Sequence, residues 1–516
     1  MPHAIVIGAG IGGLTAGALL AKAGYQTVVV EQAAVPGGCA STFQRRGFTF
    51  DVGATQVAGL EPGGIHHRIF GELGVELPPA SFCDPACAVF LPGETEPIRV
   101  WRDRTKWREE RSRQFPGSER FWWLLNQLFQ ISWRFQGRDP VLPPRNGWDL
   151  GQLIGALRPD TLLTAPFATL TVGDALRWLG LGSDQRLRTF LDLQLKLYSQ
   201  VDAEETALLY AATALAVSQA PQGLFHLHGS MQVLSDRLVT ALEQHGGQLR
   251  LNHRVTAIHQ ATGTVQGVTI QNVKTGESEY FSADEVVANV TAHNLLDLLD
   301  PTPSPQPTPA PIFPPTTWLN QRQYCDRITQ LPQPSGAFVV YLGVDRAAIP
   351  ADCAPHLQFL YDPVGEIGEN NSLFVSVSQP GDGRAPEGQA TIIASSFVNV
   401  GPWWDCDRAA YRDRKQAWME EAIAKLGRYF HLTPDTIKHC EAATPRTFAR
   451  YTARHQGYVG GLSQRLATFG PFGFGTRTPF PHLWLVGDST HPGEGTAGVS
   501  YSAHTAVRQI LAQSQP

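Results

Sequence analysis

The 516-residue sequence predicts an α/β fold, in which a parallel sheet with flanking helices is joined to a part made of helices and a mixed sheet. Three observations predict this fold. An apolar run at 4–7 leads through a glycine-rich turn into a helical pattern and then into a second β-branched run. Helical spacing continues through most of 174–217. Alternating apolar residues predict the strands of a mixed sheet at 338–344, 373–378 and 391–397.

The glycine-rich turn has the spacing GxGxxG, with Gly8, Gly10 and Gly13 between the first strand and its helix. Gly8 permits the tight turn, Gly10 lets backbone N–H groups approach a pyrophosphate, and Gly13 lets the helix pack on the strand. Glu31 ends the second strand, where a carboxylate accepts hydrogen bonds from ribose hydroxyls. This stretch therefore predicts a Rossmann-type site for FAD or NAD. The other residues expected on this side of the site are Ile11, Gly12 and Gln32.

A second backbone-rich loop follows Glu31, where nicotinamide-binding folds usually continue into another helix. It contains a double glycine and then a G-F-x-x-D-x-G segment at 47–53. From the three glycines through this segment, the sequence resembles the superfamily of FAD-dependent amine oxidases and carotenoid desaturases. The resemblance implies FAD as the cofactor. It also adds these residues to the expected FAD site: Gly37, Gly38, Cys39, Gly53 and Ala54.

The C-terminal segment predicts the other half of the FAD site. An apolar strand at 481–486 ends in Gly487-Asp488, and a helix follows at 500–511. In the superfamily, the matching Gly-Asp lies beside the flavin pyrophosphate and ribitol. The following helix N-terminus, near Gly498 and Val499, points its positive end at the isoalloxazine. The resemblance also implies that the backbone of Val255 contacts the adenine.

Three further segments, at 444–451, 457–461 and 491–495, are similar to bacterial-type carotenoid desaturases and to the related cis–trans isomerases. Over nearly the whole chain, the resemblance is to the hydroxycarotenoid 3,4-desaturases (C-3′,4′ desaturases) of oxygenic photosynthetic bacteria. It implies an enzyme that introduces a C=C into a hydroxylated carotenoid by hydride transfer to flavin N5. The reoxidant is then oxygen or a quinone.

Two alternatives stay open from the sequence. Gly487-Asp488-Ser489 stands where desaturases commonly have Ala-Gly-Thr, and this form is typical of the isomerases, which catalyse no net redox change. A carotenoid-binding flavoprotein without turnover is the second alternative. A soluble amine oxidase is disfavoured, because the segment at 491–498 does not have the amine oxidase form.

The candidate polar groups near the flavin are His491, Glu494, Arg446 and Tyr458, and the sequence assigns no catalytic residue among them. His226 and His228 lie on one side of a possible strand, and we expect ordinary structural roles for both. No metal is expected, because the adjacent pair His66-His67 has no carboxylate or cysteine cluster near it. The seven scattered cysteines without a CxxC favour free thiols in a reducing compartment.

Composition is that of a globular protein with an apolar interior or an apolar substrate: 42% hydrophobic residues and a formal net charge of −5. The absence of a Lys/Arg-rich tract argues against nucleic acid as a partner. No apolar stretch reaches the roughly 20 residues that span a bilayer. An aromatic helical stripe of Trp122, Leu125, Phe129 and Trp133 faces either the core or a membrane surface. We therefore expect a cytoplasmic protein that is peripherally associated with the membrane.

The expected division of the chain is discontinuous. Residues 1–75, 221–300 and 440–516 form the FAD-binding domain, and 76–220 and 301–439 form the substrate- and membrane-facing domain. The proline-dense segment 301–315 cannot form a helix or a central strand, which predicts an exposed connection.

Overall fold

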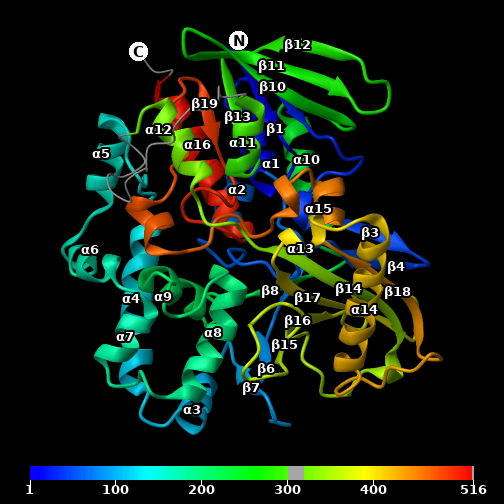
Figure 1. The fold of residues 1–516 in the computed structure, drawn as a ribbon. Coiled ribbons are helices and arrows are strands. Elements are labelled where there is room, and N and C mark those ends of the chain that lie inside the picture. The colour runs from blue at the N-terminus through cyan, green and yellow to red at the C-terminus, as the bar shows by residue number, and fades with distance from the viewer. Residues whose placement is uncertain (300–318, 514–516) are drawn as a thin grey trace.

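The computed structural model describes residues 1–299 and 319–513. The proline-dense segment 301–315 therefore lies outside the described residues. The described chain has three regions: a parallel-sheet unit at the top of Figure 1, a helical lobe below it on one side and a mixed sheet on the other. The predicted α/β class, with a dinucleotide unit beside helices and a mixed sheet, is confirmed. The domain boundaries remain a proposal.

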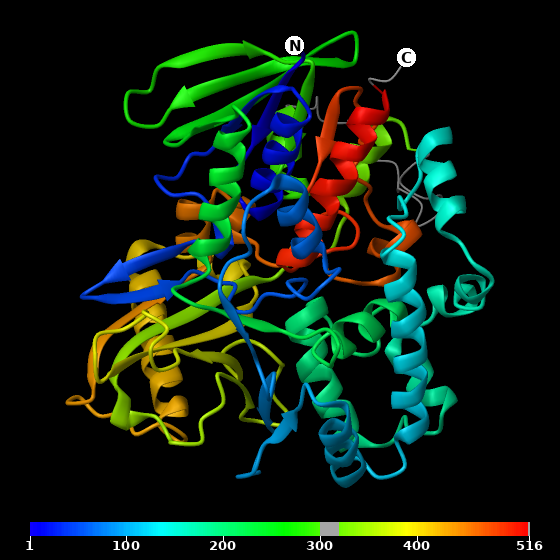
Figure 2. The ribbon, with the colours of Figure 1, turned by 180° about the vertical axis from the view of Figure 1, so that it is seen from behind.

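The upper unit is built on a five-stranded sheet whose neighbouring strands are all parallel. In sheet order its strands are β19 (Leu483–Leu485), β13 (Glu285–Ala288), β1 (His3–Ile7), β2 (Gln26–Val30) and β9 (Gln248–Arg250). The helices around it are α1 (Ile11–Lys22), α2 (Ile65–Leu73), α10 (Gln232–Gln244), α11 (Ala292–Leu299), α12 (Gln321–Thr329) and α16 (Thr496–Gln513). First and last segments of the chain thus share one sheet, as Figure 2 shows from behind.

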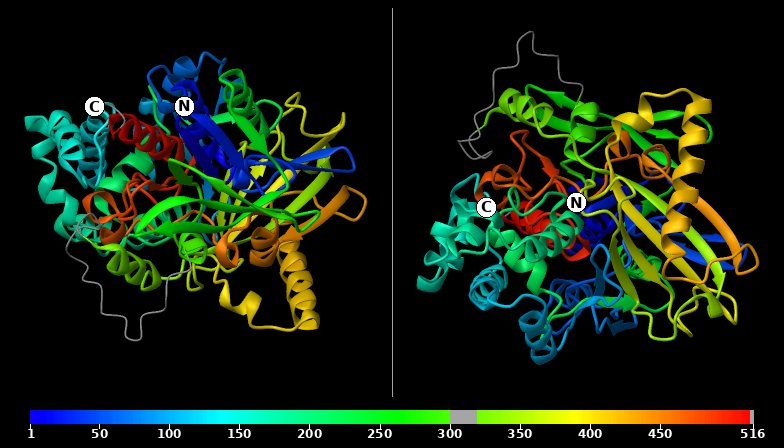
Figure 3. Two further views of the ribbon diagram at one scale, coloured as in Figure 1. Left: turned by 90° about the horizontal axis from the view of Figure 1, so that it is seen from above. Right: turned by 60° about the horizontal axis from the view of Figure 1, so that its bottom comes forward.

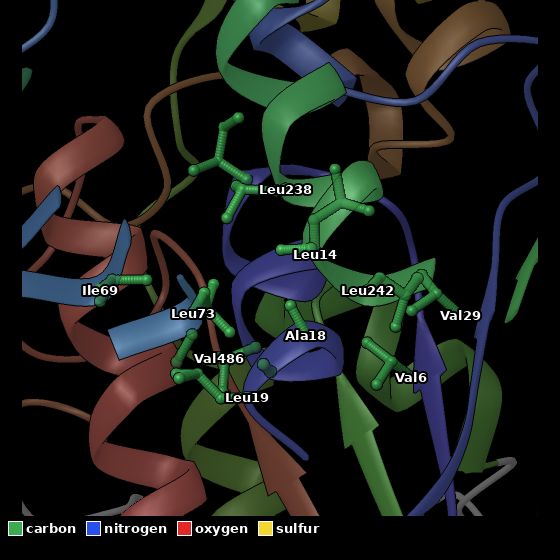
Figure 4. Close-up of a cluster of buried hydrophobic side chains, with 14 of the residues drawn as sticks. Val6, Leu14, Ala18, Leu19, Val29, Ile69, Leu73, Leu238, Leu242 and Val486 are labelled. Carbon is green, nitrogen blue, oxygen red and sulfur yellow. The ribbon is translucent and has the colours of Figure 1, made fainter. Parts of the chain in front are cut away.

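Helix α1 is the centre of this unit. All its residues except Lys22 are buried, as expected for a helix that is apolar on every side. Figure 4 shows Leu14 and Ala18 of this helix between side chains of β1, β2, α2 and α10. Burying one such leucine contributes about 1.5–3 kcal/mol, so this packing holds the helix against the sheet.

Antiparallel strands form three smaller sheets. β10 (His253–Ala261), β11 (Thr264–Asn272) and β12 (Ser278–Ser282) form a three-stranded sheet, of which the sequence predicts the last two as a hairpin. Two small ribbons pair β3 (Thr42–Arg45) with β4 (Phe48–Asp51) and β5 (Ala80–Phe82) with β8 (Phe225–Leu227).

The second sheet is mixed, as predicted. Its order is β18 (Ile437–Ala443), β14 (Gly336–Asp345), β17 (Gln389–Val398), β16 (Ser372–Val377), β15 (His356–Leu360), β6 (Cys87–Phe90) and β7 (Ile98–Val100). Only β15 and β6 are parallel neighbours. Helices α13 (Gly401–Trp404), α14 (Arg408–Leu426) and α15 (Pro445–Thr452) accompany this sheet, and the views of Figure 3 show α14 along its outer side.

The helical lobe contains α3 (Arg104–Gln114), α4 (Glu119–Gln136), α5 (Gly147–Ala156), α6 (Pro159–Leu162), α7 (Val172–Trp178), α8 (Gln185–Ser199) and α9 (Leu208–Ala216). The aromatic stripe lies on α4, where Trp122, Leu125 and Phe129 are buried in the protein. Trp122 packs edge-on against Trp107 of α3. Trp133, the fourth residue of the stripe, is half-buried. Trp122, Leu125 and Phe129 therefore belong to the interior, and the membrane interpretation of these three residues is wrong. In the described residues no helix combines the length and apolarity needed to cross a bilayer.

Candidate functional site

One large cavity lies where the three regions meet, with a volume of about 1720 Å³. That is larger than the roughly 300–1000 Å³ of ordinary ligand pockets. Every predicted cofactor-binding residue lines this cavity except Gly13, which packs behind the turn. Residues from opposite ends of the chain, such as Gly10 and Gly487, thus meet in one space.

The glycine-rich turn leaves no room for side chains. A Cβ placed on Gly8, Gly10 or Gly12 would lie 2.8 Å from an atom of Asn289. A Cβ on Gly13 would lie 2.0 Å from the carbonyl oxygen of Gly8. A side chain on any of these glycines would therefore collide with its neighbours. The N-terminus of α1 faces the cavity without a side-chain cap.

Asn289 is a site residue that the sequence analysis missed. It follows β13 directly, its backbone N–H donates to the Ile7 carbonyl at 2.9 Å, and it lines the cavity. Its side chain also lies 3.0 Å from a Cβ placed on Gly487, so it fills the gap between the two glycine-rich segments. The available signal was its position at the carboxyl end of a parallel strand, where ligands bind in such sheets.

The Glu31 carboxylate is held in place by two backbone hydrogen bonds. Its Oε2 accepts from the Ala9 N–H at 2.8 Å, and its Oε1 accepts from the Ala33 N–H at 2.8 Å. Burial raises the pKa of Glu31, while these backbone hydrogen bonds lower it. Each oxygen keeps a further lone pair, so the carboxylate can still accept hydrogen bonds from a ligand.

The second loop lies directly against the first. The N–H of Gly37 donates to the Ala9 carbonyl at 2.7 Å. Gly37 and Gly38 have φ values of 115° and 58°, a left-handed backbone that favours glycine. Gly53 packs close to the backbone of Cys39: a Cβ placed on Gly53 would lie 3.3 Å from the Cys39 carbonyl oxygen. The two loops form a continuous wall of backbone groups that a phosphate-containing ligand can approach.

The C-terminal half of the site contains an ion pair that was not predicted. Asp488 Oδ2 accepts from Arg454 Nη2 at 2.7 Å, and both residues line the cavity. Arg454 Nε donates to the Tyr458 carbonyl, which holds the guanidinium in place. Beyond Asp488, Gly498 and Val499 lie in the first turn of α16, again facing the cavity.

The candidate polar groups separate into two pairs. Glu494 and Arg446 line the cavity, and Arg446 donates to the backbone carbonyls of Trp404 and Cys406. His491 and Tyr458 are buried outside the cavity lining. Burial lowers the pKa of His491 to about 4, so this imidazole is neutral at neutral pH.

His226 and His228 have different surroundings. His226 is buried, and its Nε2 lies 3.0 Å from Asp382 Oδ2. His228 is exposed, and its Nε2 lies 2.7 Å from the hydroxyl of Ser81. Neither lines the cavity, in agreement with the structural roles expected for them.

The residues present fit a flavin dinucleotide. The cavity joins a glycine cradle, a helix N-terminus and a ribose-type carboxylate to a second glycine segment at the start of α16. A family model described as flavin containing amine oxidoreductase matches residues 11–511. The chain belongs to this family. Its cofactor is FAD.

Several relatives of the chain carry names from carotenoid metabolism. It is 27% identical to prolycopene isomerase 2 of an Oncidium hybrid cultivar, over 99% of this chain and 84% of the relative. It is 25% identical to the neurosporene-forming phytoene desaturase of Rhodobacter capsulatus, over 100% of this chain and 95% of the relative. It is 23% identical to a 4,4′-diapophytoene desaturase of Methylomonas sp., over 98% of this chain and 95% of the relative. The chain is thus a flavoprotein oxidoreductase similar to carotenoid desaturases and isomerases.

Solved structures share the fold. An oxidoreductase from Methanosarcina mazei matches with a TM-score of 0.62 at 17% identity, over 99% of this chain and 100% of that one. A putrescine oxidase matches with a TM-score of 0.63 at 15% identity, over 99% of both chains. These likenesses support the architecture and the combination of a mixed sheet with helices.

Proposed function

We propose that the protein is an FAD-dependent carotenoid desaturase that introduces a C=C at the 3,4 position of a hydroxylated carotenoid. The observation that carries the proposal is the continuity of the cavity. The same space that contains the glycine cradle extends between α8 and the mixed sheet. FAD occupies the first part in this proposal, and an elongated apolar molecule occupies the second.

The floor of the second part is a row of side chains across the mixed sheet. Residues paired in register on five neighbouring strands all line the cavity. In order from β18 to β15 they are Ala443, Val339, Ser395, Phe374 and Gln358. The opposite wall includes Leu193 and Leu197 of α8. Four of these five side chains are small or apolar, and the fifth, Gln358, donates its Nε2 to the Leu193 carbonyl at 2.8 Å. Such a row suits a polyene, which needs a long channel with few polar contacts.

FAD, when bound, supplies the acceptor for a hydride, which the side chains of this chain cannot supply. The protein contributes alignment and exclusion of water. The residues that we propose to hold the cofactor are those predicted from the sequence, together with Asn289 and Arg454. The apolar channel fixes which carbon–carbon bond of the substrate lies beside the reacting end of the cofactor.

Isomerisation of a carotenoid is the second candidate function. The similarity to prolycopene isomerase extends over 99% of this chain, so both kinds of relative match along its whole length. The two reactions need the same cofactor and the same channel. They differ in product mass, because desaturation removes two hydrogens and isomerisation removes none.

We also propose a peripheral contact with a membrane surface, made by residues other than the predicted stripe. Large apolar side chains are exposed on the outer helices of the helical lobe: Trp123, Leu150, Ile154, Leu162, Leu163 and Trp178. Arg134 and Arg158 lie in the same lobe, and aromatic and basic groups together suit the headgroup region. Oxygen or a membrane quinone remains the proposed reoxidant.

Expression in a carotenoid-producing host tests the proposal. The expected product has lost two hydrogens from a monohydroxylated end group and absorbs at longer wavelength. A product of unchanged mass with altered chromatographic retention would favour isomerisation instead. Unchanged pigment together with bound FAD would favour the carotenoid-binding flavoprotein without turnover.

A further inference from the structure

Glu494 differs from the other carboxyl groups of the cavity in its partners. Five carboxyl residues line the cavity, namely Glu31, Asp297, Glu441, Asp488 and Glu494. Asp488 pairs with Arg454, Glu441 with Arg45 and His439, and Asp297 with His455. Glu31 accepts two short backbone hydrogen bonds. Glu494 accepts one hydrogen bond, from Gln200 Nε2 to Oε2 at 3.3 Å.

Gln200 fixes the orientation of this carboxyl. It lies at the end of α8 with a φ of 66°, and its Nε2 also donates to the Gly460 carbonyl at 2.7 Å. A Cβ on Gly460 would lie 2.3 Å from Glu494 Oε2, so the backbone there closes one side of the carboxyl group. Oε2 is thereby turned to the protein wall. Among the described residues no hydrogen bond to Oε1 is found, and Glu494 itself lines the cavity.

We propose that Glu494 is the proton acceptor of the desaturation, an inference that rests on the proposed function. One carbon of the substrate gives up hydrogen with its electron pair to the flavin acceptor. On the neighbouring carbon the C–H bond breaks, its electron pair becomes the new C=C, and its proton goes to Glu494 Oε1. The two hydrogens lost thus leave as one hydride and one proton, and the charges balance.

The charged and titratable groups around Glu494 favour this role. Burial raises its pKa well above the ordinary value, and the nearby Asp488 carboxylate raises it further. Gln200 and Arg454 lower it by smaller amounts. Tyr210 is a further neighbour: its hydroxyl donates to the Tyr198 carbonyl, and its own pKa is raised by burial and by Glu494. A carboxylate in such surroundings is a stronger base than one in water, and its protonated form is stable in the apolar channel.

The test compares FAD-loaded wild-type protein with Glu494→Gln. General-base catalysis of this kind contributes about 10²–10⁴-fold, so we expect kcat/KM to fall by at least about 100-fold. In the wild type kcat/KM rises with pH as Glu494 ionises, and Glu494→Gln loses this rise. Glu494→Asp keeps an ionisable group and is expected to keep a pH-dependent rate. An equal rate and an unchanged pH profile in Glu494→Gln would overturn the proposal.

A second readout does not depend on turnover. Infrared difference spectra between low and high pH, recorded on FAD-loaded protein without substrate, report protonated carboxyl groups directly. The wild type is expected to show one carboxyl band that Glu494→Gln lacks. Glu369→Gln is the matched control, because Glu369 also has a pKa raised by burial but lies outside this cavity. An identical spectrum in wild type and Glu494→Gln would contradict the assignment. Failure of the proposed desaturase function can be told apart from failure of the Glu494 assignment. In the first case the wild type itself would form no product lighter by two hydrogens.

Discussion

Replacement of Gly13 by alanine tests how the glycine turn holds the cofactor. The new Cβ would lie 2.0 Å from the Gly8 carbonyl oxygen, whereas ordinary contacts begin at 3.4 Å. The turn must therefore move by about 1.4 Å, the difference between the two. The neighbour is backbone, so no side-chain rotation can relieve the contact. Overpacking of this kind costs about 1–3 kcal/mol.

Because the displaced turn lies at the N-terminus of α1, we expect Gly13→Ala to weaken FAD binding as well as to lower the melting temperature. A loss of about 1.4–2.8 kcal/mol corresponds to a 10- to 100-fold higher Kd. Titration of the apoprotein with FAD, followed by flavin fluorescence, measures the Kd, and thermal unfolding measures stability.

Two other glycines provide a graded control. A Cβ on Gly17 would lie 2.6 Å from Cγ2 of Val29, a longer separation than at Gly13 and one to a side chain rather than to backbone, so Gly17→Ala is expected to cost less. Gly71 lies in α2 with nothing within 4 Å of a new Cβ. Gly71→Ala is expected to stabilise the protein by about 0.5–1 kcal/mol. If Gly13→Ala bound FAD as tightly as Gly71→Ala does, the reasoning about the turn would be refuted.

Three further predictions concern burial and charge. Arg384→Met leaves the buried Asp51 without its cation and is expected to lower the free energy of unfolding by about 3–5 kcal/mol. Arg134→Met, which breaks an exposed ion pair, is expected to lower it by less than about 1 kcal/mol. Equal melting temperatures of the two variants would contradict this prediction. Burial lowers the folded-state pKa of His66 to about 4, below the unfolded value near 6.5. The neutral imidazole therefore contributes fully to the free energy of unfolding above pH 6.5, and this contribution is lost as pH falls toward 4. The melting temperature of His66→Leu should therefore fall less than that of the wild type between pH 6.5 and 4. An equal fall in both proteins would argue against this prediction. Leu163→Glu is expected to reduce co-sedimentation with liposomes, whereas Val364→Glu, on an exposed loop elsewhere, should not; equal binding would count against the proposed membrane contact.

The sequence was sufficient to predict those elements whose geometry is determined by the spacing of neighbouring residues. The strand, glycine turn and helix of β1, α1 and β2 follow from contiguous residues, and the structure has them at the expected places. The helix after Asp488 was likewise predicted, although it begins at Thr496 rather than at residue 500. The hairpin of β11 and β12 follows from alternation, but no local pattern shows that β10 completes that sheet.

Other site residues depend on contacts between distant segments. Arg454 reaches Asp488 across a separation of 34 residues, and Gln200 reaches Glu494 across 294. Neither arginine nor glutamine stands in a motif that marks it in advance. The aromatic stripe of α4 shows the same limit, because helical spacing identifies an apolar face without identifying what covers it. Trp123, on the same helix but off that stripe, is 64% exposed.

An anaerobic single turnover tests the central claim most directly. FAD-loaded protein is mixed with a monohydroxylated carotenoid without oxygen, and flavin absorbance and carotenoid mass are recorded together. Bleaching of the flavin in step with a carotenoid two hydrogens lighter is the expected result. Oxidised flavin beside a carotenoid of unchanged mass would contradict a desaturase.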